Sequence, residues 1–206
     1  MLDKILNQNQ KKHYTLEQNQ ALDLFVLQMH DRDCEVDIRI DLTGADASVN
    51  IFGVYFASAG QVIRNRVVVN HNAPNCTSNI LYKGALLGEN ARTHWDGSVY
   101  IAENAFAADT YEANRNLLLS QGTSAVSVPN LEILTGDIVR AGHASATGRF
   151  DDEQLFYLMS RGIDAKTAQK LIVRGFFEEV VQNAELEDFE QEEILKQLER
   201  KIDAVR

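Results

Sequence analysis

The sequence has few of the residues and segments that mark several large classes of protein. Only two cysteines, Cys34 and Cys76, occur in 206 residues, so we expect no disulfide framework and a reducing, cytoplasmic compartment. No run approaches the ~18 apolar residues of a membrane helix, and the first residues lack the apolar region of a signal peptide. Basic residues are also scarce, and the net charge of -10 disfavours nucleic acid and anionic membranes as partners.

The motifs of the common enzyme classes are absent as well. The sequence contains no phosphate-binding glycine loop, no dinucleotide-binding glycine pattern, no H-E-x-x-H and no G-x-S-x-G. Neither cysteine belongs to a C-x-x-C pair, which excludes the usual zinc and cluster ligand sets. Four of the five histidines, His13, His30, His71 and His94, are scattered, and we interpret them as surface or packing residues. We therefore expect no enzyme activity.

Short strands dominate the chain up to about residue 150. Both prolines and most glycines lie in this part, and only Gly162 and Gly175 follow it. Apolar and polar residues alternate in several runs, which predicts strands with one buried face. The gaps between runs are too short for crossover helices, so a doubly wound α/β fold is excluded. The predicted strands are 22–28, 35–42, 48–56, 61–69, 77–83, 98–103, 115–120 and 130–134.

Two all-β architectures agree with these strands: an antiparallel sandwich or barrel, and a solenoid of stacked coils. The centres of the apolar runs recur at steps of 17, 32, 18 and 15, which slightly favours the solenoid. We expect residues 32–147 to form parallel coils, with four apolar side chains pointing into the solenoid. These are Val68, Leu81, Leu118 and Ile133.

Three helices are expected after residue 150. Asp151 or Asp152 can cap the first, which ends at Gly162, and Asp164 can cap the second. A third helix is expected from about Leu186, and the acidic run 185–193 is interpreted as its solvated face rather than a calcium site. In the second helix the predicted inward stripe consists of Ala168, Leu171, Ile172, Gly175, Phe176, Glu179 and Val180.

His143 differs from the other histidines because it lies in a run of small residues, Ala141 to Gly148, where the strands give way to helices. Around it, the stretch PNLEILTGDIVRAGHASATGRFDDEQLFYLMSRGI (129–163) closely resembles the C-terminal part of the SufB/SufD family of iron–sulfur cluster assembly proteins, and most of all SufD. Further similarities lie at 70–74, 77–79, 82–84 and 114–120. The resemblance extends from about Tyr14 to Val181.

The resemblance implies a right-handed parallel β-helix in residues 1–148, truncated on its N-terminal side, and a helical domain in 149–206. It also implies a non-catalytic scaffold subunit that pairs with a SufB-like subunit and docks a SufC-like ATPase. Iron or an iron–sulfur cluster would be held only transiently in the full complex, with His143 contacting the metal.

Two departures from the family pattern bear on this role. SufB relatives have a sulfur-accepting cysteine at the position of Asn114, so this chain is expected to resemble SufD instead. SufD relatives often have Cys-Ser before the histidine, where this chain has Ala141 and Gly142. His143 would therefore act without that thiolate.

The second helix has an apolar flank that its predicted inward stripe leaves uncovered. Val173, Phe177 and Val181 recur at steps of four on this flank, and Arg161 lies nearby, just before a helix-ending glycine. We expect these four residues to dock the ATPase.

Two other functions remain open at this point. A carbohydrate-acting β-helix enzyme would need clustered carboxylates, for which Asp37, Asp41 and Glu103 are the candidates. A structural module without any metal is the other alternative. In isolation the exposed edge of the first coil is expected to favour a homodimer.

Overall fold

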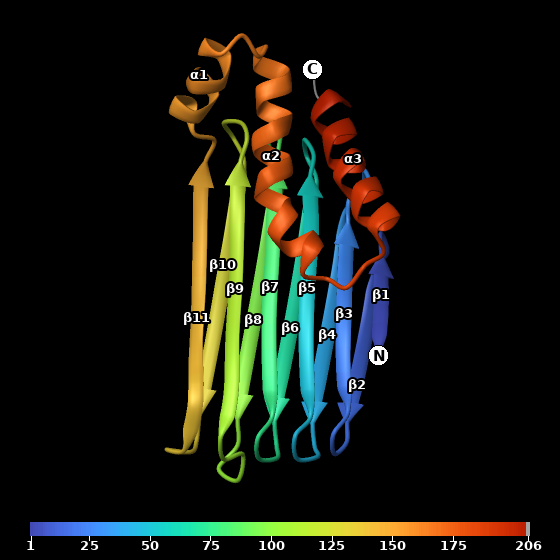
Figure 1. Cartoon of the computed structure of the whole chain (residues 1–206), viewed down its shortest axis with the longest axis vertical. Helices are drawn as coiled ribbons and strands as arrows, with labels where there is room; N and C mark the ends of the chain where they lie inside the picture. The colour runs from blue at the N-terminus through green and yellow to red at the C-terminus, as the bar shows by residue number, and fades with distance from the viewer. Residues whose placement is uncertain (205–206) are drawn as a thin grey trace.

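The computed structural model describes residues 1–204, in which eleven strands are followed by three helices (Figure 1). The strands are β1 (Leu2–Leu6), β2 (Gln10–Leu16), β3 (Ala21–Gln28), β4 (Cys34–Leu42), β5 (Ser48–Ala57), β6 (Val62–His71), β7 (Thr77–Leu86), β8 (Arg92–Ile101), β9 (Ala108–Leu118), β10 (Ser124–Ile133) and β11 (Ile138–Arg149). The helices are α1 (Asp152–Ser160), α2 (Ala165–Gln182) and α3 (Asp188–Ala204).

The strands form a parallel solenoid of about five turns. Odd-numbered strands make one sheet in the order β1-β3-β5-β7-β9-β11, and even-numbered strands make the opposite sheet, β10-β8-β6-β4-β2. The register repeats from coil to coil, so that Leu22 pairs with Val49, Val49 with Ser78, and Ser78 with Thr110. The predicted solenoid is confirmed, and the antiparallel sandwich is wrong.

Residues in the left-handed region turn the chain at one edge of every coil. Asn19, Asp46 and Asn75 have φ values of 60°, 62° and 60° there, a conformation that asparagine and aspartate tolerate better than most side chains. Their backbone N–H groups donate to carbonyls of the next coil at 3.0, 3.1 and 2.8 Å. The turn residues therefore continue the hydrogen-bond ladder around the corner, which explains the polar corners of the sequence.

The main core lies between the two sheets and is formed by alternate residues of each strand. Leu118 packs into this core as predicted, whereas Ile133 stacks on the buried Ile101 but remains 37% exposed because no further coil covers it. The prediction was wrong for Val68 and Leu81, which point outward. Both belong to apolar runs in which the alternation that identifies the inner face is missing.

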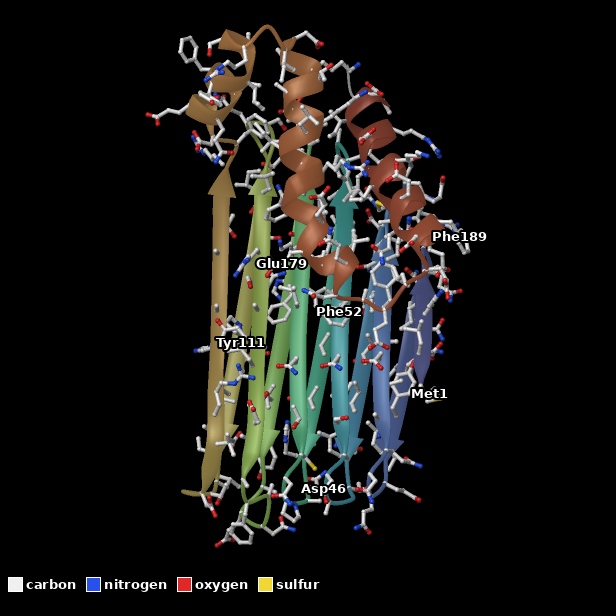
Figure 2. The ribbon with its side chains drawn as sticks, in the orientation of Figure 1. Met1, Asp46, Phe52, Tyr111, Glu179 and Phe189 are labelled. Carbon is white, nitrogen blue, oxygen red and sulfur yellow. The ribbon has the colours of Figure 1, made fainter. Side chains whose placement is uncertain are left out.

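A second core joins α2 and α3 to the outer face of the odd-numbered sheet (Figure 1). The helices cover the part of the sheet where its strands end, and Phe52 and Tyr111 lie on the same face beyond them (Figure 2). Asp151 and Asp164 cap α1 and α2 as predicted, and Gly162 follows α1 with φ 87°. The helical part of this core consists of Val173, Phe177, Val180, Val181, Ala184, Leu186, Ile194, Leu195, Leu198 and Ile202.

A buried lysine fastens α2 to the sheet. The side chain of Lys83, on β7, is 4% exposed, and its Nζ donates to the carbonyl of Phe176 at 2.6 Å. The same Nζ lies 2.6 Å from Oε2 of Glu179, which also binds Arg115 of β9 at 3.1 Å. These contacts lower the pKa of Glu179, chiefly through the hydrogen bond from Lys83. They fix α2 across two neighbouring strands.

Among the described residues, none of the helices is both long and apolar enough to span a membrane.

Candidate functional site

His143 lies in the middle of β11, the last strand of its sheet, and not in a junction between strands and helices as predicted. The small residues around it form a regular strand because β9 offers a complete pairing edge, with Gly142 opposite Tyr111 and Ala144 opposite Ala113. His143 itself is exposed.

The register places the imidazole on the inner face of the solenoid. Thr147, four residues further along β11, accepts a hydrogen bond from Nδ2 of Asn116, a buried inner residue of β9. Side chains two and four residues apart on a strand share a face, so His143 points the same way as Thr147. It therefore faces the open end of the last coil.

Polar side chains fill the interior below this end. The hydroxyl of Tyr55 donates to Oδ1 of Asn116 at 2.5 Å and accepts from Nδ2 of Asn114 at 2.8 Å. Asn116 in turn donates to Oδ1 of Asn114 at 2.8 Å. Asn114 is thus a fully buried member of a satisfied hydrogen-bond network.

Glu112 is the residue that sequence reasoning missed. It is 0% exposed, pairs in register with His143, and within residues 1–204 neither of its carboxylate oxygens has a hydrogen-bond partner. Burial raises the pKa of Glu112 to about 7, a shift that the nearby backbone N–H of Asn130 partly offsets and that Asp96 increases.

Gly97 provides the space for this carboxylate. A Cβ atom at Gly97 would lie 2.6 Å from Oε2 of Glu112 and 2.0 Å from Cη2 of Trp95, the single tryptophan. Glu112 and Trp95 therefore share one small region of the interior. Several buried polar atoms around it also lack partners in the described part of the chain: the Tyr82 hydroxyl, Nε1 of Trp95 and Oγ of Ser127.

The expected docking flank on α2 is not a surface. Val173, Phe177 and Val181 are each 0% exposed because this side of the helix packs on the sheet and on α3. The predicted inward stripe is confirmed for Ala168 and Val180, which are 0% exposed. It was wrong for Leu171 and Gly175, which are exposed. Apolar residues surround most of α2, so periodicity alone could not identify the side that the sheet covers.

Most of the exposed apolar side chains of the helices lie on α1 instead, although Leu171 on α2 and Phe189 on α3 are exposed as well. None of its residues is buried, and Phe156, Tyr157 and Met159 are all exposed. Arg161, also exposed, stacks over the Tyr157 ring with its Cζ 5.2 Å from the centroid and donates to the Tyr157 hydroxyl at 3.2 Å. A groove of about 490 Å³ lies next to α1, between this helix, α2 and the sheet. Its lining includes Leu117, Arg149, Gln154, Leu171 and Phe176.

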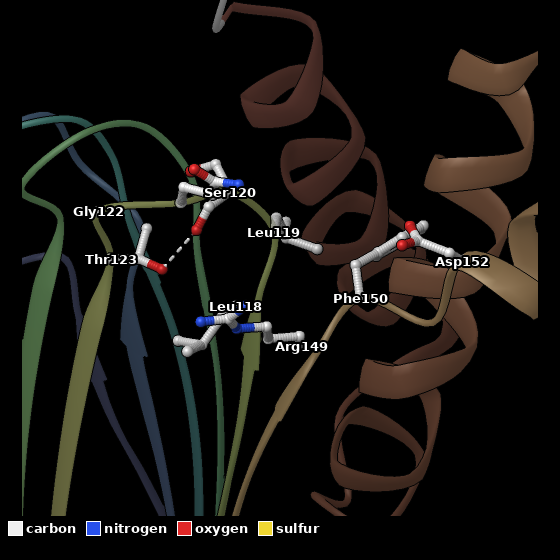
Figure 3. Close-up of a pocket in the computed structure, with 9 residues that line it drawn as sticks. Leu118, Leu119, Ser120, Gly122, Thr123, Arg149, Phe150 and Asp152 are labelled. Carbon is white, nitrogen blue, oxygen red and sulfur yellow. Dashed lines mark hydrogen bonds between the residues drawn. The ribbon is translucent and has the colours of Figure 1, made fainter.

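A smaller pocket of about 260 Å³ lies where β11 leads into α1 (Figure 3). The turn after β9 forms one wall, in which the Thr123 hydroxyl donates to the carbonyl of Ser120 at 2.8 Å. Arg149, Phe150 and Asp152 form the other wall. These residues include no nucleophile with a neighbouring base, so the pocket has no catalytic arrangement.

The other sequence candidates have local partners. Asp37 binds Lys11 at 3.2 Å and Asp41 binds His13 at 2.6 Å, on the outer face of the solenoid. Four residues of strand separate the two aspartates by about 13 Å, more than a glycosidase carboxylate pair requires. Glu103 lies in an exposed turn after β8.

Neither the cysteines nor His71 form a metal site. Burial raises the pKa of both thiols, Cys34 and Cys76. Burial also lowers the pKa of His71 to about 4, and its Nε2 is 2.8 Å from the Ser78 hydroxyl, so the imidazole is a neutral packing group. Over residues 1–204, no three His, Cys, Asp or Glu side chains are close enough to hold a metal by themselves.

Comparison with known proteins agrees with the resemblance seen in the sequence. The family model for the SUF system FeS cluster assembly, SufBD core domain, matches residues 4–176. An iron–sulfur cluster assembly SufBD family protein of Mycobacterium tuberculosis is 56% identical over 144 residues, which cover 67% of this chain and 36% of the relative. The iron–sulfur cluster assembly protein SufD of Escherichia coli is 32% identical over 141 residues, 68% of this chain and 33% of SufD.

The chain thus spans about a third of the length of these curated relatives. The family match nevertheless includes strands β2 to β11 in full, part of β1, all of α1 and most of α2. This chain belongs to the SufBD family of SUF-system iron–sulfur cluster assembly proteins.

Proposed function

We propose that this chain is a SufD-like scaffold subunit that pairs with a SufB-like subunit through the open end of its solenoid. It would act in the cytoplasm, catalyse no reaction itself, and hold iron or a nascent cluster only transiently, as cargo. The observation that carries the proposal is the character of the last coil: an uncovered end where the inward-facing His143 is exposed above a polar interior.

Exposed apolar side chains at the same end support a protein partner. Val126 and Val128 are 45% and 38% exposed on the outer face of β10, where they pair with His94 and Asp96 of β8. Ile133 and Val139 are also exposed beside the last turn. Removing this apolar edge from water is the main gain expected from pairing with another coil.

The ATPase would dock on α1 and on the groove between α1 and α2. Exposed aromatic residues and an arginine that is held over one of them are typical of the central contacts of interfaces. Arg161 keeps its proposed role, because its guanidinium is exposed and oriented by Tyr157.

The pairing is tested by anaerobic co-purification with SufB-like and SufC-like subunits from one organism, followed by iron and sulfide analysis. We expect a stable ternary complex that accumulates iron and sulfide, and His143→Ala should lower their yield without dissolving the complex. A complex that forms but never acquires metal would favour the metal-free structural module. Failure to form any complex would contradict the proposal.

The docking surface is tested with Arg161→Glu and Phe156→Ser in a pull-down with the SufC-like subunit. Both residues are exposed, so neither change should disturb the fold. Arg200→Glu is the matched control, since Arg200 is a comparably exposed arginine on α3, at the other side of the helical layer. Loss of binding with the first two variants alone is expected; unchanged binding would exclude α1 as the docking surface.

A further inference from the structure

We infer that Glu112 is a second protein ligand for Fe(II), and that it binds the metal together with His143 at the open end of the solenoid. This inference rests on the proposed function, because it adds a residue to the site at which the scaffold would hold iron. Unlike the exposed residues of the proposed interfaces, Glu112 is buried inside the coil.

The register brings the two side chains to one place. Glu112 and His143 are paired residues on neighbouring parallel strands, β9 and β11, and both lie on the inner face. Neighbouring strands are about 4.8 Å apart, so two side chains at the same height can both reach an ion between them. His143 is the outer of the two and is exposed, so the metal has an entry path from the open end.

The buried, unpartnered carboxylate of Glu112 indicates that a cation binds beside it. Its side chain is 0% exposed, yet within the described residues its two oxygens have no hydrogen-bond partner. A buried carboxylate without partners is costly, and native proteins seldom retain one for packing alone. A cation at this position would satisfy the carboxylate, and the glycine at position 97 leaves the room that its oxygens use.

The donor atoms define the class of metal. One carboxylate and one imidazole suit a borderline divalent ion such as Fe(II), and no thiolate is available nearby, because Asn114 occupies the position of the SufB cysteine. Two protein ligands leave the other coordination positions to water or to a partner subunit. This chain would therefore contribute oxygen and nitrogen ligands, while sulfur ligands would come from the partner.

Trp95 provides a direct readout of metal binding. It is the single tryptophan and it is buried. Its ring lies near the Glu112 carboxylate, because a Cβ atom placed on Gly97 would be 2.0 Å from the ring and 2.6 Å from Oε2 of Glu112. A paramagnetic ion bound at Glu112 should quench its fluorescence. Anaerobic titration with Fe(II), and with Co(II) as a spectroscopic probe, would combine this quenching with calorimetric affinities.

We expect Glu112→Gln and His143→Ala each to lower the affinity for Fe(II) by at least ~10-fold and to remove the quenching. Glu132→Gln is the matched control, because Glu132 is an exposed glutamate at the same end whose register partner, Tyr100, lies on the outer face. Thermal unfolding of Glu112→Gln should show an intact fold, and Glu112→Asp should bind with intermediate affinity.

Wild-type affinity in Glu112→Gln would overturn the inference, as would a wild-type chain that binds no Fe(II). The proposed function would survive either result if the ternary complex still forms and His143→Ala still lowers its iron content. Loss of the complex itself would instead contradict the proposed function.

Discussion

The first and the last coil of the described solenoid differ in how their inward-facing polar groups are satisfied. At the N-terminal end Asp3 points inward, where its carboxylate accepts hydrogen bonds from Nζ of Lys12 at 2.8 Å and from the Tyr14 hydroxyl at 2.6 Å. At the C-terminal end Glu112 and the hydroxyl oxygen of Ser127 are buried, and neither has a hydrogen-bond partner among the described residues.

The pKa values follow this difference. The hydrogen bonds from Lys12 and Tyr14 lower the pKa of Asp3, whereas burial raises the pKa of Glu112 to about 7. One carboxylate is therefore stabilised in its charged form by its own chain, and the other is not. An inward-facing carboxylate can thus be satisfied within this fold, so the unpartnered groups near His143 indicate a function outside the chain's own stability.

The largest effect is expected from Glu112→Gln, which should stabilise the protein by about 1–3 kcal/mol at pH 8. The amide has the same shape but cannot ionise in the buried site. Since the folded-state pKa of Glu112 lies above its unfolded value, the wild type keeps its full stability below about pH 4.5 and loses it as the pH rises through about 7. The two proteins should therefore differ at pH 8 and converge at pH 4.5.

Urea unfolding at several pH values measures this difference. The charged and polar groups that face the carboxylate, Asp96 on β8, the N–H of Asn130 on β10 and His143 on β11, remain unchanged in the variant. Equal stability at pH 8 would mean that Glu112 has a partner inside the fold, and the contrast between the two ends would disappear.

The corresponding acid-to-amide change in the first coil, Asp3→Asn, should have the opposite effect on the free energy of unfolding. Asp3→Asn should destabilise the protein by about 1 kcal/mol at pH 7, because a charged acceptor of two hydrogen bonds becomes neutral. The folded-state pKa of Asp3 is lowered, so this contribution is present above about pH 4 and is lost as the pH falls further. Parallel urea titrations at pH 7 and pH 3 test it, and a stabilising effect at pH 7 would contradict our account of this end.

The sequence predicted the solenoid and its strands because corners and apolar runs recur in every coil. It did not predict which side of a strand faces inward where the alternation fails. In the run Val67–Val69, for example, Val67 and Val69 face inward and Val68 faces outward. For α2 the choice of buried face depends on the sheet beneath, which no local pattern contains.

The site was predicted in part. The family resemblance identified His143, but β11 continues through it only because β9 lies alongside. Glu112 was missed because its significance comes from a strand that follows 31 residues later, at position 143. A local signal was present: Glu112 alternates with Thr110 and Asn114 on the inner face of a strand, where an acid is unusual.

His143→Ala should change stability by at most ~1 kcal/mol, no more than either change above. The imidazole is exposed at an uncovered end, so little buried volume depends on it. Thermal unfolding measures this value, with Thr147→Val as a control that removes a hydrogen bond to Asn116 on the same face. A large loss of stability would show that His143 is a packing residue, and the functional contrast between the two ends would weaken.

The smallest effect on stability is expected at the apolar edge of the last coil, where Val126→Thr and Val128→Thr together should stay within ~0.5 kcal/mol. Threonine keeps the β-branched shape that suits a strand, and both valines already face solvent. Pairing with a SufB-like subunit should nevertheless weaken at least ~10-fold, because the hydroxyls reduce the apolar area removed from water. Val68→Thr is the matched control: Val68 lies on the outer face of the same sheet, on β6, two strands from the edge. If Val68→Thr weakens pairing as much as the edge variants do, the partner covers the whole sheet and the open end loses its special role.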